Sequence, residues 1–149
     1  MAAAKFDPML GRTLGDRFTV VAKLGAGSMG AVYRARQANI NRDVALKILR
    51  SDKAMDEASK ARFLREARAN SVLVSPHTVT VFDFGQSETG ELYLVMELLD
   101  GESLGQRLSR DTRLSAHAAV DMACQALRSL AEAHAKGSVH RDLKPDNLF

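Results

Sequence analysis

The most informative part of this chain is Val139-His140-Arg141-Asp142-Leu143-Lys144-Pro145-Asp146-Asn147, near the end of its 149 residues. It places a carboxylate at Asp142, a cation two residues later at Lys144 and a carboxamide five residues after the acid at Asn147. Phosphoryl transfer needs such a set, because a carboxylate can orient a hydroxyl nucleophile, a lysine can neutralise phosphate charge and an amide oxygen can bind Mg²⁺. A charged loop after a helix could supply any three of these residues, but the whole ordered stretch favours a site for phosphate chemistry.

Composition narrows the class of protein. A chain of 149 residues is ordinarily one domain and can bury a core, and 46% hydrophobic with 26% charged residues is typical of soluble globular proteins. The net charge of +3 is scattered, whereas a nucleic-acid-binding protein would concentrate basic residues on one face. The start lacks a secretory signal, and no run of eighteen apolar residues could span a membrane, so we expect a cytoplasmic protein.

A glycine-rich segment lies between two predicted strands. Apolar residues alternate at 18, 20, 22 and 24 and again over 32–36, which is the period of a half-buried strand. Between them Gly25, Gly27 and Gly30 form the pattern G-x-G-x-x-G, which dinucleotide-binding folds also carry. Those folds open a helix after the last glycine, whereas this chain continues as a strand, so the segment predicts a hairpin closing over phosphates. A Cβ atom there would hinder close approach and the φ > 0 conformations of a turn.

Residues 43–49 predict a third strand, with three aliphatic side chains on one face and Ala45 and Lys47 on the other. A small residue beside a lysine suits an adenine ring next to its phosphates. Taken alone, Lys47 would be an ordinary surface lysine on an edge strand. Next to the glycine-rich segment, it is a candidate phosphate ligand.

The remaining elements are a helix over 56–70, strands over 79–84 and 92–98, a short helix over 104–108 and a long helix that Ser115 caps and that ends at Lys136. The long helix carries an apolar stripe with a spacing of three or four residues, which is typical of a face that is buried in a complete domain. In these 149 residues alone we expect the stripe to be uncovered and the chain to be poorly soluble. The chain has a single cysteine, which excludes an internal disulfide. This cysteine lies in the apolar stripe, which predicts a packed thiol. The stripe consists of Val120, Cys124, Leu127, Ala131 and His134.

The order of these features resembles the protein kinase catalytic domain. Residues 140–147 match the catalytic-loop pattern H-R-D-x-x-x-x-N, and residues 44–47 match V-A-I-K with Leu46 in place of isoleucine. The segments Gly27-Ser28-Met29-Gly30-Ala31-Val32-Tyr33-Arg34-Ala35 and Phe63-Leu64-Arg65-Glu66-Ala67 are similar to bacterial eukaryotic-like serine/threonine kinases. Lys144 is also typical of serine/threonine kinases.

The resemblance implies an α+β fold: a five-stranded antiparallel N-lobe sheet with the αC helix, followed by the first helices and the catalytic loop of a helical C-lobe. Residues 1–16 would be a flexible lead-in, 17–98 the N-lobe, and 99–149 the hinge with an incomplete C-lobe. The D-F-G aspartate that binds Mg²⁺, the activation segment and the remaining helices would follow Phe149. We therefore expect the N-terminal portion of a longer kinase, inactive on its own.

The resemblance also implies residue roles. Asp142 orients the substrate hydroxyl and accepts its proton, Lys144 steadies the γ-phosphate, and Asn147 binds one Mg²⁺. Lys47, held by Glu66, binds the α- and β-phosphates. Arginines on both sides of Glu66 make an ion pair within its own helix the alternative.

For the nucleotide, the resemblance implies a roof of aliphatic side chains over adenine, a gatekeeper at Met96, and backbone hydrogen bonds to the adenine edge from Glu97 and Leu99. Phe149 would form the floor. The implied ATP-binding set is Leu24, Gly25, Ala26, Gly27, Ser28, Gly30, Val32, Ala45, Lys47, Met96, Glu97, Leu99 and Phe149.

The function implied is transfer of the ATP γ-phosphate to serine or threonine hydroxyls of a protein substrate, with ATP and Mg²⁺ as cofactors and no nucleic-acid partner or membrane contact from this segment. The full-length protein could dimerise, phosphorylate itself or carry a membrane anchor beyond residue 149.

One alternative is a pseudokinase that serves as an ATP-binding scaffold or regulatory module, which the residue at the D-F-G position would reveal. Another is a dinucleotide-binding oxidoreductase, which depends on the glycines alone and fails if the hairpin is correct.

Overall fold

The computed structural model describes residues 7–27, 30–49 and 56–149, and the chain forms two compact units. The first unit runs to Ser71 and continues through Val81–Leu98. The second unit comprises Val72–Thr80 and Leu99–Phe149. The division after Leu98 falls where the sequence analysis ended the N-lobe, but the connector Val72–Thr80 groups with the second unit.

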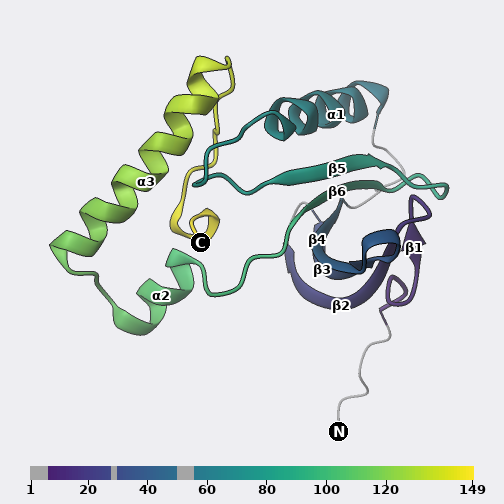
Figure 1. The fold of residues 1–149 in the computed structure, drawn as a ribbon, viewed down its shortest axis with the longest axis horizontal. Coiled ribbons are helices and arrows are strands. Elements are labelled where there is room, and N and C mark those ends of the chain that lie inside the picture. Colours follow the sequence, from purple (N-terminus) through teal and green to yellow (C-terminus); the bar gives the residue numbers. More distant parts are fainter. Residues whose placement is uncertain (1–6, 28–29, 50–55) are drawn as a thin grey trace, which may run out of the picture. The chain divides into compact units, whose positions relative to one another are not determined.

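The first unit contains an antiparallel sheet of six strands in the order β1-β2-β3-β4-β6-β5, which curls strongly (Figure 1). Five of these strands begin within two residues of their predicted starts, and the sixth, β1, is a two-residue strand that no sequence pattern indicated. The prediction of an antiparallel sheet with helices is therefore confirmed, with one strand more than expected. The strands are β1 Thr13–Leu14, β2 Phe18–Gly27, β3 Gly30–Gln37, β4 Arg42–Leu49, β5 Val81–Gln86 and β6 Leu92–Glu97.

The core of the first unit lies on one face of this sheet. Val44, Leu46 and Ile48 of β4 belong to the buried cluster, whereas Ala45, which is also 6% exposed, does not, and this confirms the alternation predicted for the strand. Burying such aliphatic side chains contributes about 1.5–3 kcal/mol each, so this face stabilises the sheet. The buried cluster consists of Leu14, Phe18, Val20, Tyr33, Ala35, Val44, Leu46, Ile48, Tyr93 and Val95.

The expectation of a flexible lead-in is wrong for the part of residues 1–16 that the structure describes. Leu14 is 1% exposed and belongs to the core. The backbone N–H of Gly11 donates to the Val20 carbonyl at 2.9 Å, and Val20 N–H donates to the Arg12 carbonyl at 2.8 Å. A two-residue strand is too short to produce a period, so only its pairing with β2 reveals it.

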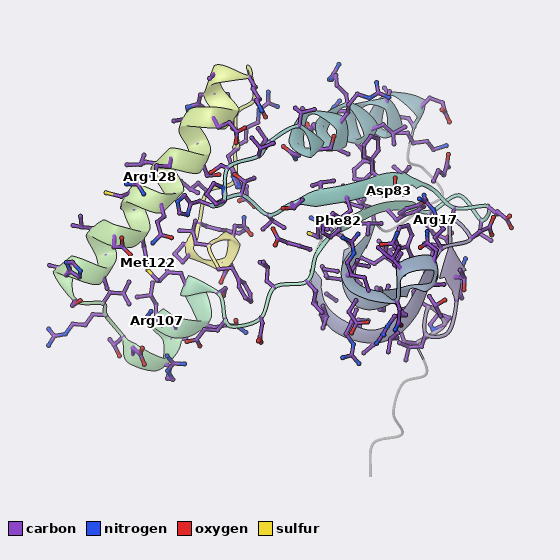
Figure 2. The ribbon with its side chains drawn as sticks, viewed as in Figure 1. Arg17, Phe82, Asp83, Arg107, Met122 and Arg128 are labelled. Carbon is purple, nitrogen blue, oxygen red and sulfur yellow. The ribbon has the colours of Figure 1, made fainter. Side chains whose placement is uncertain are left out.

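The curl of the sheet brings its edge strands together. Arg12, just before β1, forms an ion pair with Glu91 at 2.9 Å, and Arg17 pairs with Asp83 of β5 (Figure 2). Asp83 begins an Asp-Phe-Gly tripeptide, but it lies in β5, before the catalytic loop in the sequence and in an ion pair with arginine. This tripeptide is therefore distinct from the expected metal-binding motif.

One long helix and one short 3₁₀ helix belong to the first unit. Helix α1 spans Glu57–Ser71 and lies along β5 (Figure 1), with Ala67 3% exposed. The 3₁₀ helix η1, Ala38–Ile40, connects β3 to β4. The helix predicted over 56–70 is confirmed.

The second unit contains α2, Leu104–Asp111, α3, Ala116–Ala135, and the 3₁₀ turn η2, Pro145–Asn147. Ser103 caps α2 through a reciprocal pair of hydrogen bonds with Gln106. Ser115 caps α3 as predicted, accepting from Ala118 N–H at 3.2 Å. Among the helices of the described residues, none combines the length and hydropathy needed to cross a bilayer.

The apolar stripe of α3 is exposed, as predicted for this chain. Val120 is 63% and Leu127 62% exposed, and Cys124 is exposed as well, so the expectation of a packed thiol is wrong. Periodicity identified an apolar stripe correctly but could not show which residues pack on the helix. The less exposed side of α3 is a different one, formed by Ala118, Met122, Gln125, Ala126, Ser129, Leu130 and Ala133.

Candidate active site

The strand register gathers part of the predicted nucleotide site on one face of the sheet. Val32 of β3 lies opposite Lys47 of β4, and Ala45 lies opposite Met96 of β6. Directly opposed residues share a face, and so do residues two apart in a strand. Val32, Ala45, Lys47 and Met96 are therefore neighbours on the face opposite the core.

The glycine hairpin consists of residues 24–27 of β2 and residues 30–32 of β3, with Gly25 opposite Val32 and Gly27 opposite Gly30. A Cβ added at Gly30 would lie 2.1 Å from the Ile48 carbonyl oxygen, and its φ of 153° also favours glycine. Gly25 and Gly27 have negative φ and open space around the Cβ position. Ala26 is exposed in β2, and Ser28, also predicted to bind ATP, lies outside the described residues. The two predicted reasons for glycine therefore apply to different residues. Gly30 is required by the backbone geometry, whereas Gly25 and Gly27 leave room for an approaching ligand.

The predicted Lys47–Glu66 pair is not formed. Lys47 is half-buried on β4, whereas Glu66 is exposed on α1. Within residues 7–27, 30–49 and 56–149 no ion pair joins them, and none links Glu66 to an arginine of its own helix. Helix α1 packs through Ala67 on β5 rather than on β4, which leaves Glu66 facing solvent.

The other predicted adenine contacts lie at the ends of these elements. Glu97 is the last residue of β6 and Leu99 the first of the second unit's main segment. Leu24, predicted as part of the roof, is 53% exposed beside an irregularity in the β2–β3 pairing. Phe149 is 61% exposed, and its ring lies 3.5 Å from where a Cβ of Gly101 would stand. Gly101 has φ 135°, so its backbone favours glycine, whereas a Cβ there would make only an ordinary van der Waals contact with the ring.

The three predicted catalytic-loop residues converge in the second unit. Lys144 Nζ lies 3.0 Å from Asp142 Oδ2. Asn147 Nδ2 donates to the backbone carbonyl of Asp142 at 2.8 Å and to its Oδ2 at 3.2 Å. The backbone N–H of Asp142 donates to His140 Nδ1 at 3.3 Å, and Arg141 takes the left-handed conformation with φ 64°. A tight turn thus presents a carboxylate, an ammonium and an amide on one exposed side of the loop.

The electrostatics of this turn favour an ionised Asp142. The hydrogen bond from Lys144 and then that from Asn147 lower the pKa of Asp142 below its ordinary value. Because Asn147 uses its Nδ2 on Asp142, its Oδ1 is left to accept a hydrogen bond or to bind a cation. Mg²⁺ is usually held by one or two carboxylates together with phosphate oxygens and water, so the Asn147 amide oxygen fits as one ligand among several. In the described part of the chain, no cluster of three or more acidic, histidine or cysteine side chains could hold a metal by itself.

The turn that carries Asp142, Lys144 and Asn147 contacts α2. Leu104 N–H donates to the Leu148 carbonyl at 2.8 Å, just after η2. A Cβ at Gly105 would lie 2.0 Å from Asp146 Oδ1 and 3.3 Å from its backbone nitrogen. The start of α2 and η2 are therefore in direct contact, and glycine at position 105 permits it. Sequence reasoning missed this role, because it depends on residues that are distant in the sequence.

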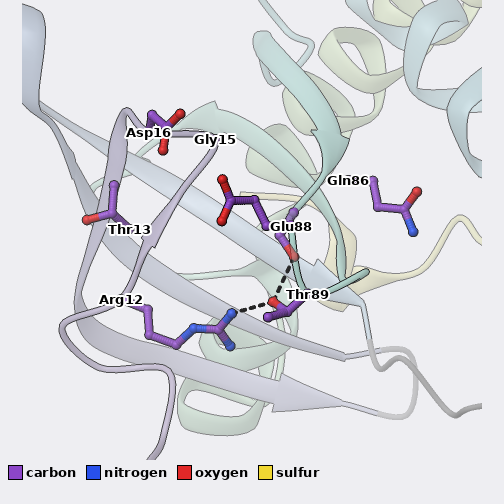
Figure 3. A pocket seen from close by; sticks show the side chains of 8 residues that line it. Arg12, Thr13, Gly15, Asp16, Gln86, Glu88 and Thr89 are labelled. Atoms are coloured by element: carbon purple, nitrogen blue, oxygen red, sulfur yellow. Dashed lines mark hydrogen bonds between the residues drawn. The ribbon is translucent and has the colours of Figure 1, made fainter.

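A separate hollow of about 310 Å³ lies in the first unit, lined by the β1–β2 turn and by residues 86–89 (Figure 3). Arg12 Nη2 donates to Thr89 Oγ1 at 2.6 Å across it. None of the predicted site residues lines this hollow. It is not a continuation of the nucleotide face.

Comparison with known proteins settles the family. The sequence pattern of the protein kinase domain matches residues 18–149. The chain belongs to the protein kinase family. Its relatives include the serine/threonine-protein kinase pkn3 of Myxococcus xanthus, 44% identical over 143 residues, which cover 96% of this chain and 26% of pkn3. PknA of Mycobacterium tuberculosis is 42% identical over 147 residues, which cover 96% of this chain and 34% of PknA.

Solved kinase structures agree with the fold. The crystal structure of the M. tuberculosis PknI kinase domain matches with a TM-score of 0.82 and 31% identity, over 92% of this chain and 55% of that one. The predicted kinase-like architecture and the resemblance to bacterial serine/threonine kinases are thereby confirmed. This kinase chain spans about a quarter to a third of the length of the curated relatives pkn3 and PknA.

Proposed function

We propose that this chain is the ATP-binding and catalytic-loop portion of a serine/threonine protein kinase that works in the cytoplasm. The observation that carries the proposal is the turn in which Asp142 lies 3.0 Å from Lys144 Nζ and 3.2 Å from Asn147 Nδ2. Its three functional groups are those that phosphoryl transfer to a hydroxyl requires.

Each group has a distinct part in the reaction. Asp142, kept ionised by its neighbours, accepts a hydrogen bond from a serine or threonine hydroxyl of the protein substrate and takes its proton as the oxygen attacks the γ-phosphorus of ATP. The bond from this phosphorus to the oxygen that bridges it to the β-phosphate breaks, and ADP leaves. Lys144 balances the negative charge on the γ-phosphoryl oxygens. Asn147 Oδ1 would supply one ligand to Mg²⁺, and the ion would neutralise negative charge on the phosphates of the nucleotide.

The nucleotide is held by the first unit. Lys47 binds the α- and β-phosphates, and the glycine hairpin covers them with backbone N–H groups. Val32, Ala45 and Met96, which share a face with Lys47, pack against adenine. Movement of α1 would bring Glu66 to Lys47 during nucleotide binding.

Nucleotide binding tests the proposal in this chain directly. Titration calorimetry with an Mg²⁺-bound, non-hydrolysable ATP analogue should show binding, and Lys47→Met should weaken it by about 10-fold because a charge-assisted contact to phosphate is lost. Lys60→Met is the matched control, since Lys60 pairs with Glu57 on α1 at 2.8 Å. Equal affinity in wild type and Lys47→Met, or no binding at all, would contradict the proposal.

We also propose that these 149 residues transfer no phosphate alone, because no Asp-Phe-Gly follows the catalytic loop within them. Incubation with ATP, Mg²⁺ and a basic protein substrate should give no turnover, and turnover abolished by Asp142→Ala would refute this. In a chain that also carries the following D-F-G segment, Asp142→Ala should lower the rate by about 10²–10⁴-fold, the contribution of a general base.

A further inference from the structure

A carboxylate from the N-terminal segment lies across the base of the glycine hairpin. Asp7 Oδ2 is 2.9 Å from Lys23 Nζ, and the hydroxyl of Tyr33 donates to the same carboxylate at 3.1 Å. Lys23 and Tyr33 are directly opposed on β2 and β3. One side chain therefore binds both strands at the same level, and we call these three residues the Asp7 cluster.

The position of the cluster along the hairpin is significant. The pairing is irregular immediately after Lys23, and the three pairs that follow are Gly25 with Val32, Ala26 with Ala31 and Gly27 with Gly30. None of these pairs has a polar side chain that could join the two strands. Glycine-rich strands lose more conformational entropy on ordering than other strands do, and they carry no side chains that could hold the two strands together. The Asp7 cluster thus joins β2 to β3 at the last pair of residues before the first glycine of the hairpin.

Asp7 is itself held in place by the chain that follows it. Its carboxylate accepts from Met9 N–H at 3.1 Å, and its carbonyl accepts from Leu10 N–H at 3.1 Å. Gly11 then pairs with Val20 of β2. The carboxylate therefore belongs to an ordered turn that is fixed to the sheet.

The cluster is also chemically matched. Tyr33 is 4% exposed, so its hydroxyl needs a hydrogen-bond partner in the folded protein, and Asp7 supplies one. The hydrogen bond from Lys23 is the largest cause that lowers the pKa of Asp7. Asp7 is consequently a carboxylate at neutral pH.

We propose that Asp7 is a positioning residue that orders the glycine hairpin from outside the kinase domain pattern, which begins at residue 18. By joining Lys23 to Tyr33, it limits how far β2 and β3 can separate where the glycines begin. The consequence for nucleotide rests on the function proposed above, in which this hairpin covers the phosphates. The ordering of the hairpin does not depend on that function.

The test compares Asp7→Ala and Asp7→Asn with Glu88→Ala, a matched control that removes an exposed carboxylate from the turn before β6. Amide hydrogen exchange is measured in the whole chain without nucleotide. Amides of residues 24–27 and 30–33 should exchange about 5- to 10-fold faster in Asp7→Ala, less so in Asp7→Asn and unchanged in Glu88→Ala, because local opening depends on local contacts. Amides of β4 and β6 and the melting temperature should stay near those of the wild type.

Affinity for an Mg²⁺-bound ATP analogue provides the second measurement. It should fall about 3- to 10-fold in Asp7→Ala, since a less ordered site must lose more entropy on binding. Tyr33→Phe removes only the hydroxyl and should reproduce part of both effects. Unchanged exchange at 24–33 in Asp7→Ala would overturn the proposal whether or not nucleotide binds, and faster exchange with unchanged affinity would overturn the role in positioning. Failure of the wild-type chain to bind nucleotide would instead refute the proposed function, while the exchange result would still decide whether Asp7 orders the hairpin.

Discussion

Among single residues, the glycines of the hairpin divide into those that the fold requires and those that a ligand would require. A methyl group at position 30 would stand 2.1 Å from the Ile48 carbonyl oxygen and 2.9 Å from Leu49 Cα, both of which are backbone atoms that cannot turn away. At position 27 the same methyl group would meet no atom within 4 Å. Alanine at position 30 should therefore lower the stability of the fold, whereas alanine at position 27 should weaken nucleotide binding.

Gly30→Ala should lower the free energy of unfolding by about 2–4 kcal/mol, as expected for a clash combined with a strained φ. Gly27→Ala should leave it within about 1 kcal/mol of the wild type and weaken binding of an ATP analogue by about 10-fold, because the added methyl group would lie between backbone and phosphate. Urea denaturation and calorimetry measure the two quantities. If Gly27→Ala unfolded as easily as Gly30→Ala, the distinction would be wrong.

Asp142 offers a second prediction at this scale. Its folded-state pKa is depressed, so it stays ionised as the pH falls below its ordinary value, and the stability from its contacts with Lys144 and Asn147 is lost only as the pH falls through the depressed pKa. Lys144→Met should shift the pKa of Asp142 upward, because it removes the largest cause of the depression. Carboxyl ¹³C NMR measures this titration. Lys136→Met, which removes a lysine bonded to Glu132 instead, should leave it unchanged.

The spacing of residues in the sequence predicted Asp142, Lys144 and Asn147 as a group. The structure brings their side chains together, because they lie close in the chain and a single turn determines their contacts. The Lys47–Glu66 pair could not be derived in this way. It depends on where α1 packs, and that depends on contacts with β5 that are distant in the sequence. Leu24 and Phe149 were placed by resemblance alone, and both are exposed.

At the scale of the elements, α3 holds the connector that follows α1. The Glu132 carboxylate accepts from Val74 N–H at 3.0 Å and from Ser75 N–H at 2.8 Å, and Ser129 and Thr78 share a hydrogen bond of 2.6 Å. The hydrogen bond from Lys136 and those two backbone N–H groups lower the pKa of Glu132 to about 2. A single side chain thus satisfies two backbone donors of a loop that has no regular structure.

Glu132→Ala should accelerate amide exchange at residues 74 and 75 by about 10-fold or more, since each loses its acceptor. Because the folded pKa of Glu132 is depressed, protection in the wild type should be complete above its unfolded value near 4.5 and should be lost as the pH falls through about 2. Exchange measured by NMR across this range tests both statements. Asp121→Ala, which removes a carboxylate bonded to Gln125 on the same helix, should not affect residues 74 and 75.

Element types were predictable where the signal was long or local. Alternation along the strand identified β4, and one serine located the start of α3. The strand β1 was missed, because two residues cannot display a period and its partner β2 alone defines it. The curl that brings Arg12 to Glu91 and Arg17 to Asp83 has no local signature, since it results from the packing of the whole core.

At the scale of the whole molecule, the apolar stripe of α3 should make this chain associate with itself. Val120 and Leu127 lie about two turns apart on α3 and are each more than 60% exposed, which is unusual for neighbouring large aliphatic side chains on a helix. Size-exclusion chromatography over a range of concentrations should show species larger than a monomer. The double variant Val120→Gln with Leu127→Gln should shift the population to monomer, whereas Val74→Gln, at a position that is 83% exposed but outside the stripe, should not. A monomer at all concentrations in the wild type would contradict this prediction.

The contact of Gly105 with Asp146 has a consequence for how related chains can vary. A carbon added to the first turn of α2 at this position would meet the carboxylate of the acid that precedes Asn147, so a larger residue there requires that side chain to turn away. We expect any relative with alanine or serine at the first position to carry a shorter or differently directed side chain at the second. Randomising codons 105 and 146 together and selecting for folded protein would test this dependence. Variants with large residues at both positions should be depleted among the survivors.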